Sequence, residues 1–323
     1  DRGFQVYNDA YPEGRRQLDL TRLRLGRFEA GAIVANGRRL TRMSDPWRQP
    51  LAAIGSLLSG AVGPGDALRA ARLRHDAVAG FRSGSLDPDR PVVEPERTTA
   101  EELAARGFSP AFIQQFFVPF FGGVFLERQL ETAAPVFLFD FAMFALGRAT
   151  LPAGGMAAIP AQLAAALPAD SVRTGCRVRG VTPGRVELAE GGVLTARHVV
   201  VATDLPAAAA ILPVEWQGGW AERREKSTTL VAFAADRSPL GSPTLVVSGE
   251  QAGPIDNLTV PSDVAAGYAP PGGAVICISL RQEYAGASRR DETVPAIREQ
   301  AGRWLGSCVG GWRHLATIHV PHA

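Results

Sequence analysis

An uninterrupted run of mostly β-branched residues, Val199-Val200-Val201-Ala202, constrains the fold of this chain more than any other sequence feature. Such a run is typical of a strand buried on both faces, which is found in the middle of an α/β sheet. The run closes a longer block, Leu151–Asp204, which opens with the residues LPAGGM. Within the block we expect a helix at 157–167 and short strands at 172–174, 176–182, 185–188 and 193–195. The block therefore predicts a β-meander against a helix, with a return to a parallel sheet at Val199.

A ligand site is expected at the end of the valine strand. Thr203 and Asp204 end the apolar run with two polar residues. Ligands of doubly wound sheets bind beyond the carboxyl ends of the strands. Backbone groups around Val178, in the meander, are then available to pair with the edge of a purine.

The rest of the chain predicts helices first and antiparallel strands later. Asn36-Gly37 separates two alternating runs and is a residue pair preferred in tight hairpins. We expect helices at 50–82 (two of them), 98–106, 111–117, from Pro135 onward and at 291–305, with a surface loop at 83–97. We expect strands at 229–235, 244–247, 256–260, 274–280 and 315–320. This succession favours a mixed α/β fold in which a partial Rossmann-like domain is interleaved with a domain of antiparallel sheet plus helices.

Composition excludes several classes of function. A formal net charge of +2 gives no reason to expect a nucleic-acid partner. The histidines and the three cysteines show no metal-ligand spacing, so no metal site is expected, and the scattered cysteines favour a reducing cytoplasm. No apolar run approaches the length that spans a bilayer, and no GxSxG motif supports a hydrolase.

Two apolar features keep more than one interpretation. The stretch PVFLFDFAMFAL, residues 135–146, predicts a buried helix first, and a peripheral membrane surface is the alternative. The phenylalanines at 116, 117, 120, 121 and 125 are expected to pack between helices, to line a substrate site, or to do both. Gly122-Gly123 predicts a tight turn rather than a phosphate cradle, because no P-loop residue follows it.

The block 151–204 resembles the second FAD-contacting segment of the flavin amine oxidase superfamily, which includes phytoene desaturases and protoporphyrinogen oxidases. The segment DRGFQ at the start of the chain, followed by YPE, is similar to the part of the family that follows its first nucleotide-binding motif. FFVPFFGGVFLERQL resembles a substrate-domain helix and turn, and residues 312–323 resemble the lead-in to the C-terminal flavin segment.

The resemblance implies FAD as cofactor and a set of contact residues. The candidate flavin neighbours are Gly3, Phe4 and Gln5. Val178 is the candidate adenine contact, through its backbone N–H and C=O, and the candidate adenosine or pyrophosphate neighbours are Ala202 and Thr203. It implies a discontinuous, partial FAD-binding domain, residues 1–26 and 151–208, and a substrate-binding domain, residues 27–150 and 209–323. No catalytic residue is assigned.

Departures from the family pattern refine the expected function. No GxGxxG occurs in these residues, so this motif is expected upstream of Asp1, and the C-terminal flavin segment is expected beyond the last residue. We therefore expect the chain as it stands to hold FAD weakly or not at all.

The lysine that classical amine oxidases place shortly after the valine strand is replaced by Pro206-Ala207-Ala208-Ala209-Ala210, and Lys226 lies too far downstream. This favours flavin-dependent hydride removal from an apolar or cyclic small molecule over amine oxidation. The alternative is a non-catalytic binding protein that keeps the fold without flavin. The oligomeric state does not follow from the sequence.

Overall fold

The computed structural model describes residues 5–44, 47–48, 62–86, 97–217, 226–284 and 290–321. The chain divides into two compact units, which we treat separately. The first comprises residues 1–162 and 227–321, and the second comprises Leu163–Lys226 together with the last two residues. Gly3, Phe4, most of the expected loop at 83–97 and the first of the two helices expected at 50–82 lie outside the described residues.

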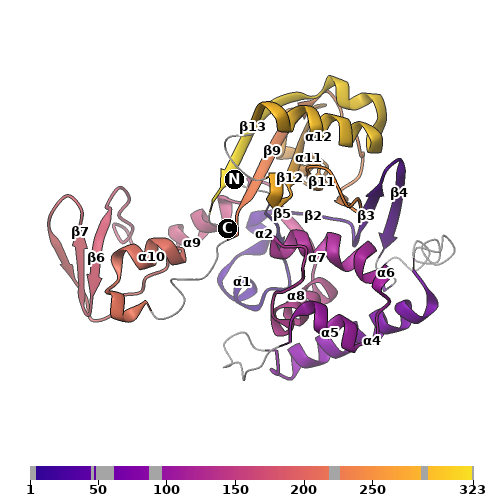
Figure 1. The fold of residues 1–323 in the computed structure, drawn as a ribbon. Helices are drawn as coiled ribbons and strands as arrows, with labels where there is room; N and C mark the ends of the chain where they lie inside the picture. The colour runs from indigo at the N-terminus through magenta and orange to yellow at the C-terminus, as the bar shows by residue number, and fades with distance from the viewer. Residues whose placement is uncertain are drawn as a thin grey trace. The chain divides into compact units, whose positions relative to one another are not determined.

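A seven-stranded sheet forms the centre of the first unit (Figure 1). Its strands follow the order β13 (Arg313–Val320), β9 (Thr228–Ala235), β12 (Ala274–Leu280), β11 (Ile255–Thr259), β10 (Leu245–Ser248), β3 (Gly31–Asn36) and β4 (Arg39–Ser44). The pairing is antiparallel except between β10 and β3, which run parallel. Gly37 has a φ of 58° in the turn between β3 and β4, which confirms the predicted hairpin.

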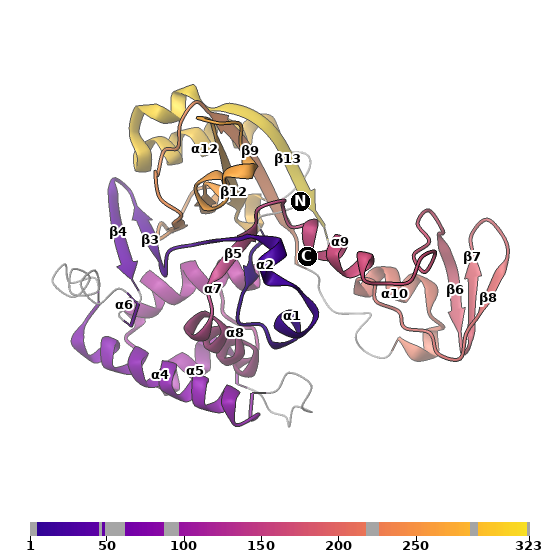
Figure 2. The ribbon, with the colours of Figure 1, turned by 180° about the vertical axis from the view of Figure 1, so that it is seen from behind.

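The two faces of this sheet have different neighbours (Figure 2). One face packs against α12 (Arg290–Leu305), and Ile297, Ala301 and Trp304 of that helix join the strands in one apolar cluster. The opposite face, over β10, β3 and β4, is covered by a second cluster that is rich in phenylalanine. The α12 layer therefore covers one face of the sheet, and the phenylalanine-rich layer covers the part of the other face formed by β10, β3 and β4.

Five α-helices and a π-helical segment build the phenylalanine-rich layer. They are α4 (Pro64–Arg82), α5 (Thr99–Ala105), α6 (Pro110–Phe112), the π-helical segment Ile113–Phe117, α7 (Val118–Phe125) and α8 (Ala134–Leu146). The predicted capping box is present, because the Thr98 hydroxyl accepts from the Glu101 N–H and the Glu101 carboxylate accepts from the Thr98 N–H. Phe117 and Phe121 are buried among other aromatic rings, which confirms the helix-packing interpretation for these residues.

Gly122 and Gly123 lie inside α7, so the predicted tight turn is wrong. A Cβ atom on Gly122 would lie 2.9 Å from the Glu127 carbonyl oxygen, and one on Gly123 would lie 3.0 Å from Asp256 Oδ2 on β11. The glycine pair therefore allows the helix to approach its neighbours closely. Close helix packing and tight turns both favour glycine, so the glycine pair alone did not distinguish the two.

A smaller sheet of the first unit has the order β1 (Tyr7–Asn8), β5 (Ala149–Pro152) and β2 (Leu25–Arg27). The short helices α1 (Pro12–Gln17) and α2 (Leu20–Leu23) lie between β1 and β2 in the chain, and α11 (Pro261–Val264) follows β11. Phe28, Leu151 and Ala265 are buried in one apolar cluster, and Met156 and Tyr268 pack against it. The LPAGGM segment is thus anchored in the first unit.

The second unit contains the predicted meander. Its elements are β6 (Val178–Thr182), β7 (Arg185–Leu188), β8 (Val193–Thr195) and α10 (Leu205–Ile211), preceded by α9 (Ala158–Ala165), which spans the boundary between the units. The strands predicted at 185–188 and 193–195 are confirmed. The strand predicted at 172–174 is not present.

The buried strand predicted at Val199–Ala202 is also wrong. The segment belongs to no strand, and the side chain of Val200 is 86% exposed. A strand in the middle of a sheet is paired on both edges, and no strand of the described residues pairs with this segment. The sequence run alone therefore predicted burial that the described residues do not provide.

Candidate functional site

The outer edge of β6 has outward-facing backbone groups at the predicted adenine contact. The Ala189 N–H donates to the Arg177 carbonyl oxygen over 2.8 Å, and Val178 lies opposite Leu188 of β7. Positions in an antiparallel ladder alternate between pairs that exchange hydrogen bonds and pairs whose N–H and C=O groups point outward. Val178 occupies a pair of the second kind, so its N–H and C=O point away from β7. β6 is an edge strand of its three-stranded sheet.

Ala202 and Thr203 lie in the same unit as Val178. Both are exposed and directly precede α10, whose N-terminus is capped by Asp204 through a 2.8 Å hydrogen bond from the Ala207 N–H. α10 lies against β6, and Val181 and Ala208 are the buried side chains in the described part of this unit. The three predicted contact residues are thus held by two elements that pack together.

Gln5 is exposed and precedes β1, in the first unit. Two residues later Tyr7 pairs with Thr150 of β5, and the Thr150 hydroxyl donates to the Tyr7 carbonyl oxygen over 2.6 Å. The segment that resembles the family's flavin-contacting loop is therefore fixed at its C-terminal end to the strand that leads into LPAGGM. The structure describes neither Gly3 nor Phe4.

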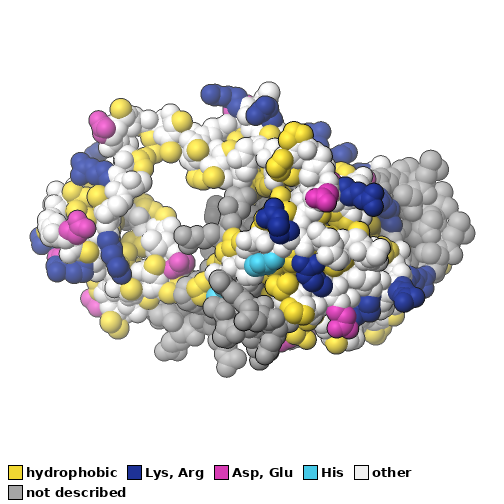
Figure 3. All heavy atoms as spheres, turned by 90° about the horizontal axis from the view of Figure 1, so that it is seen from above, with side chains coloured by type: hydrophobic (Ala, Val, Ile, Leu, Met, Phe, Trp, Pro, Cys, Tyr) yellow, Lys and Arg dark blue, Asp and Glu magenta, His cyan; other side chains and the backbone are white. Residues whose placement is uncertain are grey.

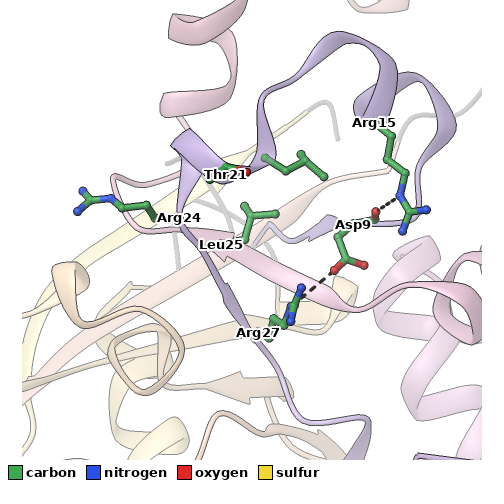
Figure 4. A pocket seen from close by; sticks show the side chains of 7 residues that line it. Asp9, Arg15, Thr21, Arg24, Leu25 and Arg27 are labelled. Carbon is green, nitrogen blue, oxygen red and sulfur yellow. Dashed lines mark hydrogen bonds and ion pairs between the residues drawn. The ribbon is translucent and has the colours of Figure 1, made fainter.

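A pocket of about 790 Å³ in the first unit is lined by Asp9, Arg15 and residues in and around α2 and β2 (Figure 4). Arg15 Nε donates to the Asp9 carbonyl oxygen over 2.6 Å, and Arg27 Nε lies 3.7 Å from Asp9 Oδ2. Arg24 points away from both of these arginines in Figure 4. Because the guanidinium groups do not converge, the pocket is not built as a phosphate clamp. Figure 3 likewise shows Lys and Arg side chains spread over the visible face among Asp and Glu.

Asp140 is the ionisable group within the phenylalanine-rich helix α8. Burial raises the pKa of its carboxyl to about 6, and the same carboxylate contributes, after burial, to a raised pKa of the Tyr11 phenol. The folded state therefore binds the Asp140 proton more tightly than the unfolded chain does. Stability from this residue is present at low pH and is lost as the pH rises through about 6.

Asp140→Asn is accordingly expected to increase the free energy of unfolding at pH 7 by about 1–3 kcal/mol, because the neutral amide avoids burial of a charge. The gain should disappear near pH 4, where the wild-type carboxyl is protonated. Urea denaturation at the two pH values measures the gain at pH 7 and its disappearance near pH 4. Exposed Asp170→Asn is the matched control. Equal effects of Asp140→Asn at both pH values would contradict the assignment.

The residues present fit a bound nucleotide cofactor in one specific respect. The edge of an adenine presents one hydrogen-bond acceptor and one donor. The N–H and C=O of one residue that both face outward from an edge strand supply the matching donor and acceptor. Val178 has this arrangement.

Within the described ranges, no group of three or more His, Cys, Asp or Glu side chains is arranged to hold a metal ion, and no helix is long and apolar enough to cross a membrane.

Solved structures share this fold at low sequence identity. An oxidoreductase from Methanosarcina mazei is similar with a TM-score of 0.66 and 13% identity, over 93% of this chain and 70% of that one. Wild-type putrescine oxidase bound to putrescine gives a TM-score of 0.65 and 13% identity, over 97% and 76%. Cyclohexylamine oxidase from Brevibacterium oxydans gives 0.61 and 15%, over 99% and 73%. Comparison with functionally curated proteins gave no significant match.

These similarities confirm the mixed α/β fold class. The family described as "Flavin containing amine oxidoreductase" matches residues 1–317, and the chain belongs to this family. The cofactor is therefore FAD, and the predicted resemblance to the superfamily is confirmed. The non-catalytic binder considered above gains no support from this match.

Proposed function

We propose that the protein removes hydride from an apolar or cyclic small molecule, and that amines are not its preferred substrates. The observation that carries this proposal is the composition of α10. The residues LPAAAAI occupy the stretch in which classical amine oxidases, by resemblance, place a lysine. Lys226 is the single lysine of the chain and is too distant in sequence to replace it. Phytoene desaturases and protoporphyrinogen oxidases are the relatives that this departure favours.

In this proposal FAD, when bound, supplies the hydride acceptor. The chain itself supplies position and exclusion of water. The outward N–H and C=O of Val178 hold the adenine, and Ala202 and Thr203 lie near the adenosine or pyrophosphate. Gly3, Phe4 and Gln5 are the proposed flavin neighbours. The discontinuous regions 1–26 and 151–208 belong to the FAD-binding domain, and the remaining residues bind substrate.

The phenylalanine-rich layer and the sheet face beside it are the surfaces proposed to bind the apolar substrate. Phe116 and Phe120 are only partly buried, unlike Phe117 and Phe121. Partly buried aromatic rings offer contact area to an apolar ligand at little entropic cost. We also propose a cytoplasmic location, with the peripheral membrane contact of residues 135–146 as the alternative.

Anaerobic flavin bleaching of the full gene product tests this function. We expect the protein to purify with flavin absorbance or to gain it on addition of FAD. Phytoene in detergent or protoporphyrinogen should then bleach the flavin at least tenfold faster than putrescine or cyclohexylamine. Faster bleaching by either amine would contradict the proposal, and a colourless protein that gains no flavin absorbance would contradict the cofactor assignment.

A further inference from the structure

Two polar side chains of β11 are buried, and one oxygen atom of each has no hydrogen-bond partner. Asn257 is 7% exposed and Thr259 is fully buried. Asn257 Oδ1 and Thr259 Oγ1 are both without a partner, while the Asn257 amide nitrogen donates to Asp256 Oδ2 over 3.4 Å. A buried polar atom that lacks a partner costs free energy, so such atoms require an explanation. The two residues are two positions apart on one strand, and their side chains therefore lie on the same sheet face.

That face is opposite the α12 layer. Leu258, between the two polar residues, belongs to the apolar cluster that contains α12, so Asn257 and Thr259 point to the other side. Val247, the register partner of Asn257 on β10, belongs to the phenylalanine-rich cluster. The unpaired oxygens thus lie at the border of the surface that we propose for the apolar substrate.

A row of small side chains leads across the sheet to Thr259. Its register partners, strand by strand, are Cys277 on β12, Ala232 on β9 and Ala316 on β13. Thr259 is buried, whereas Cys277, Ala232 and Ala316 are half-buried. Tyr268, whose phenol oxygen is also buried without a partner, is within electrostatic range of Cys277. We call Thr259, Cys277, Ala232 and Ala316 the small-residue row.

We propose that the small-residue row is the floor of a substrate subsite, and that Asn257 and Thr259 bind a hydroxyl group at its inner end. Asn257 Oδ1 is an amide oxygen and can only accept a hydrogen bond, and the orientation of the amide is set by the bond from its nitrogen to Asp256 Oδ2. The Thr259 hydroxyl can donate. Positions i and i+2 of a strand are about 6.8 Å apart, so one hydroxyl located between them donates to Asn257 and accepts from Thr259. A ketone or a plain hydrocarbon leaves Asn257 Oδ1 without a donor.

This inference rests on the proposed function, since it specifies the apolar or cyclic substrate as one that carries a hydroxyl group. 2-Naphthol and 2-methylnaphthalene are suitable probes, because they have similar shapes and differ by the hydroxyl. We expect the full gene product to bind 2-naphthol at least tenfold more tightly in equilibrium dialysis. Thr259→Val and Asn257→Leu should each reduce this preference to threefold or less, and leave the affinity for 2-methylnaphthalene unchanged.

A second measurement separates a ligand site from a structural hydroxyl. Thr259→Val removes an unpaired buried hydroxyl, so the ligand-free protein should keep or increase its urea midpoint. Thr150→Val is the matched control: Thr150 is equally buried, but its hydroxyl donates to Tyr7, and its loss should lower the midpoint. A drop with Thr259→Val as large as that with Thr150→Val overturns the inference.

One outcome of the probe experiment would contradict the inference. Equal affinity of the wild-type protein for both probes, the case of no binding included, overturns the inference. Flavin absorbance is read on the same sample. Hydroxyl preference without flavin uptake refutes only the proposed function, and flavin uptake without hydroxyl preference refutes only this inference.

Discussion

Val178→Pro is expected to weaken FAD binding by about 10- to 100-fold, because proline removes the one backbone N–H that we assign to the adenine. This N–H points outward from an edge strand, so its loss breaks no hydrogen bond of the meander. Titration of the flavin-free full gene product with FAD, followed by flavin fluorescence, measures the effect. Val178→Ala is the matched control. It alters the side chain and keeps the N–H, and should change the affinity by no more than about threefold.

The pair of variants separates a backbone contact from a side-chain contact. If Val178→Ala weakened FAD binding as much as Val178→Pro, the side chain rather than the backbone would carry the interaction. If neither variant changed the affinity, the adenine would bind elsewhere. Equal urea midpoints for both variants and the wild-type protein establish that the meander remains folded.

Glu250→Ala is expected to reduce the free energy of unfolding by about 3 kcal/mol or more, because several donors lose their acceptor together. The carboxylate accepts from the Gly37 N–H at 3.0 Å, from Trp304 Nε1 at 2.8 Å and from Gln300 Nε2 at 3.1 Å, and it pairs with Arg303 Nη2 at 2.9 Å. It therefore connects the β3–β4 hairpin to α12.

Exposed Glu299 provides the control for Glu250. Its side chain is 79% exposed and lies 3.4 Å from Arg303 Nη1, so Glu299→Ala should cost no more than about 0.5 kcal/mol. Urea denaturation at pH 7 compares the two variants. A loss with Glu250→Ala similar to that with Glu299→Ala would contradict the connecting role.

The stabilisation by Glu250 also depends on pH. Burial by itself would raise the pKa of its carboxyl, but hydrogen bonds from Trp304, Arg303 and Gly37 outweigh burial and lower it. A carboxyl with a lowered folded-state pKa contributes stability above its unfolded pKa and loses it as the pH falls through the folded value. The difference between the wild-type protein and Glu250→Ala should therefore shrink in acid.

Local signals in the sequence were sufficient for most elements. The capping box at Thr98, the Asn36-Gly37 turn and the alternation in 274–280 depend on neighbouring residues, and each predicted the observed element. Predictions that required distant partners were less successful. Val199–Ala202 has the composition of a buried strand but pairs with no described strand, and Gly122-Gly123 packs closely inside a helix.

The candidate site divides in the same way. Family resemblance pointed to Val178, and the register of β6 and β7 then added the outward direction of its backbone groups. The strand that contains Asn257 and Thr259 was predicted, but the burial of its side chains and its register were not. The unpaired oxygens of these two residues could therefore not be predicted. A polar residue alternating with apolar ones usually indicates a solvated face, whereas here Asn257 and Thr259 are both buried.

Hydrogen exchange with and without FAD tests the central claim most directly. For the full gene product, we predict that FAD slows amide exchange in peptides covering 176–180 and 199–204, and leaves exchange across β7 and β8 unchanged. Flavin binding with no protection at Val178 and Thr203 would contradict the claim that the edge of β6 holds the adenine beside the segment leading into α10.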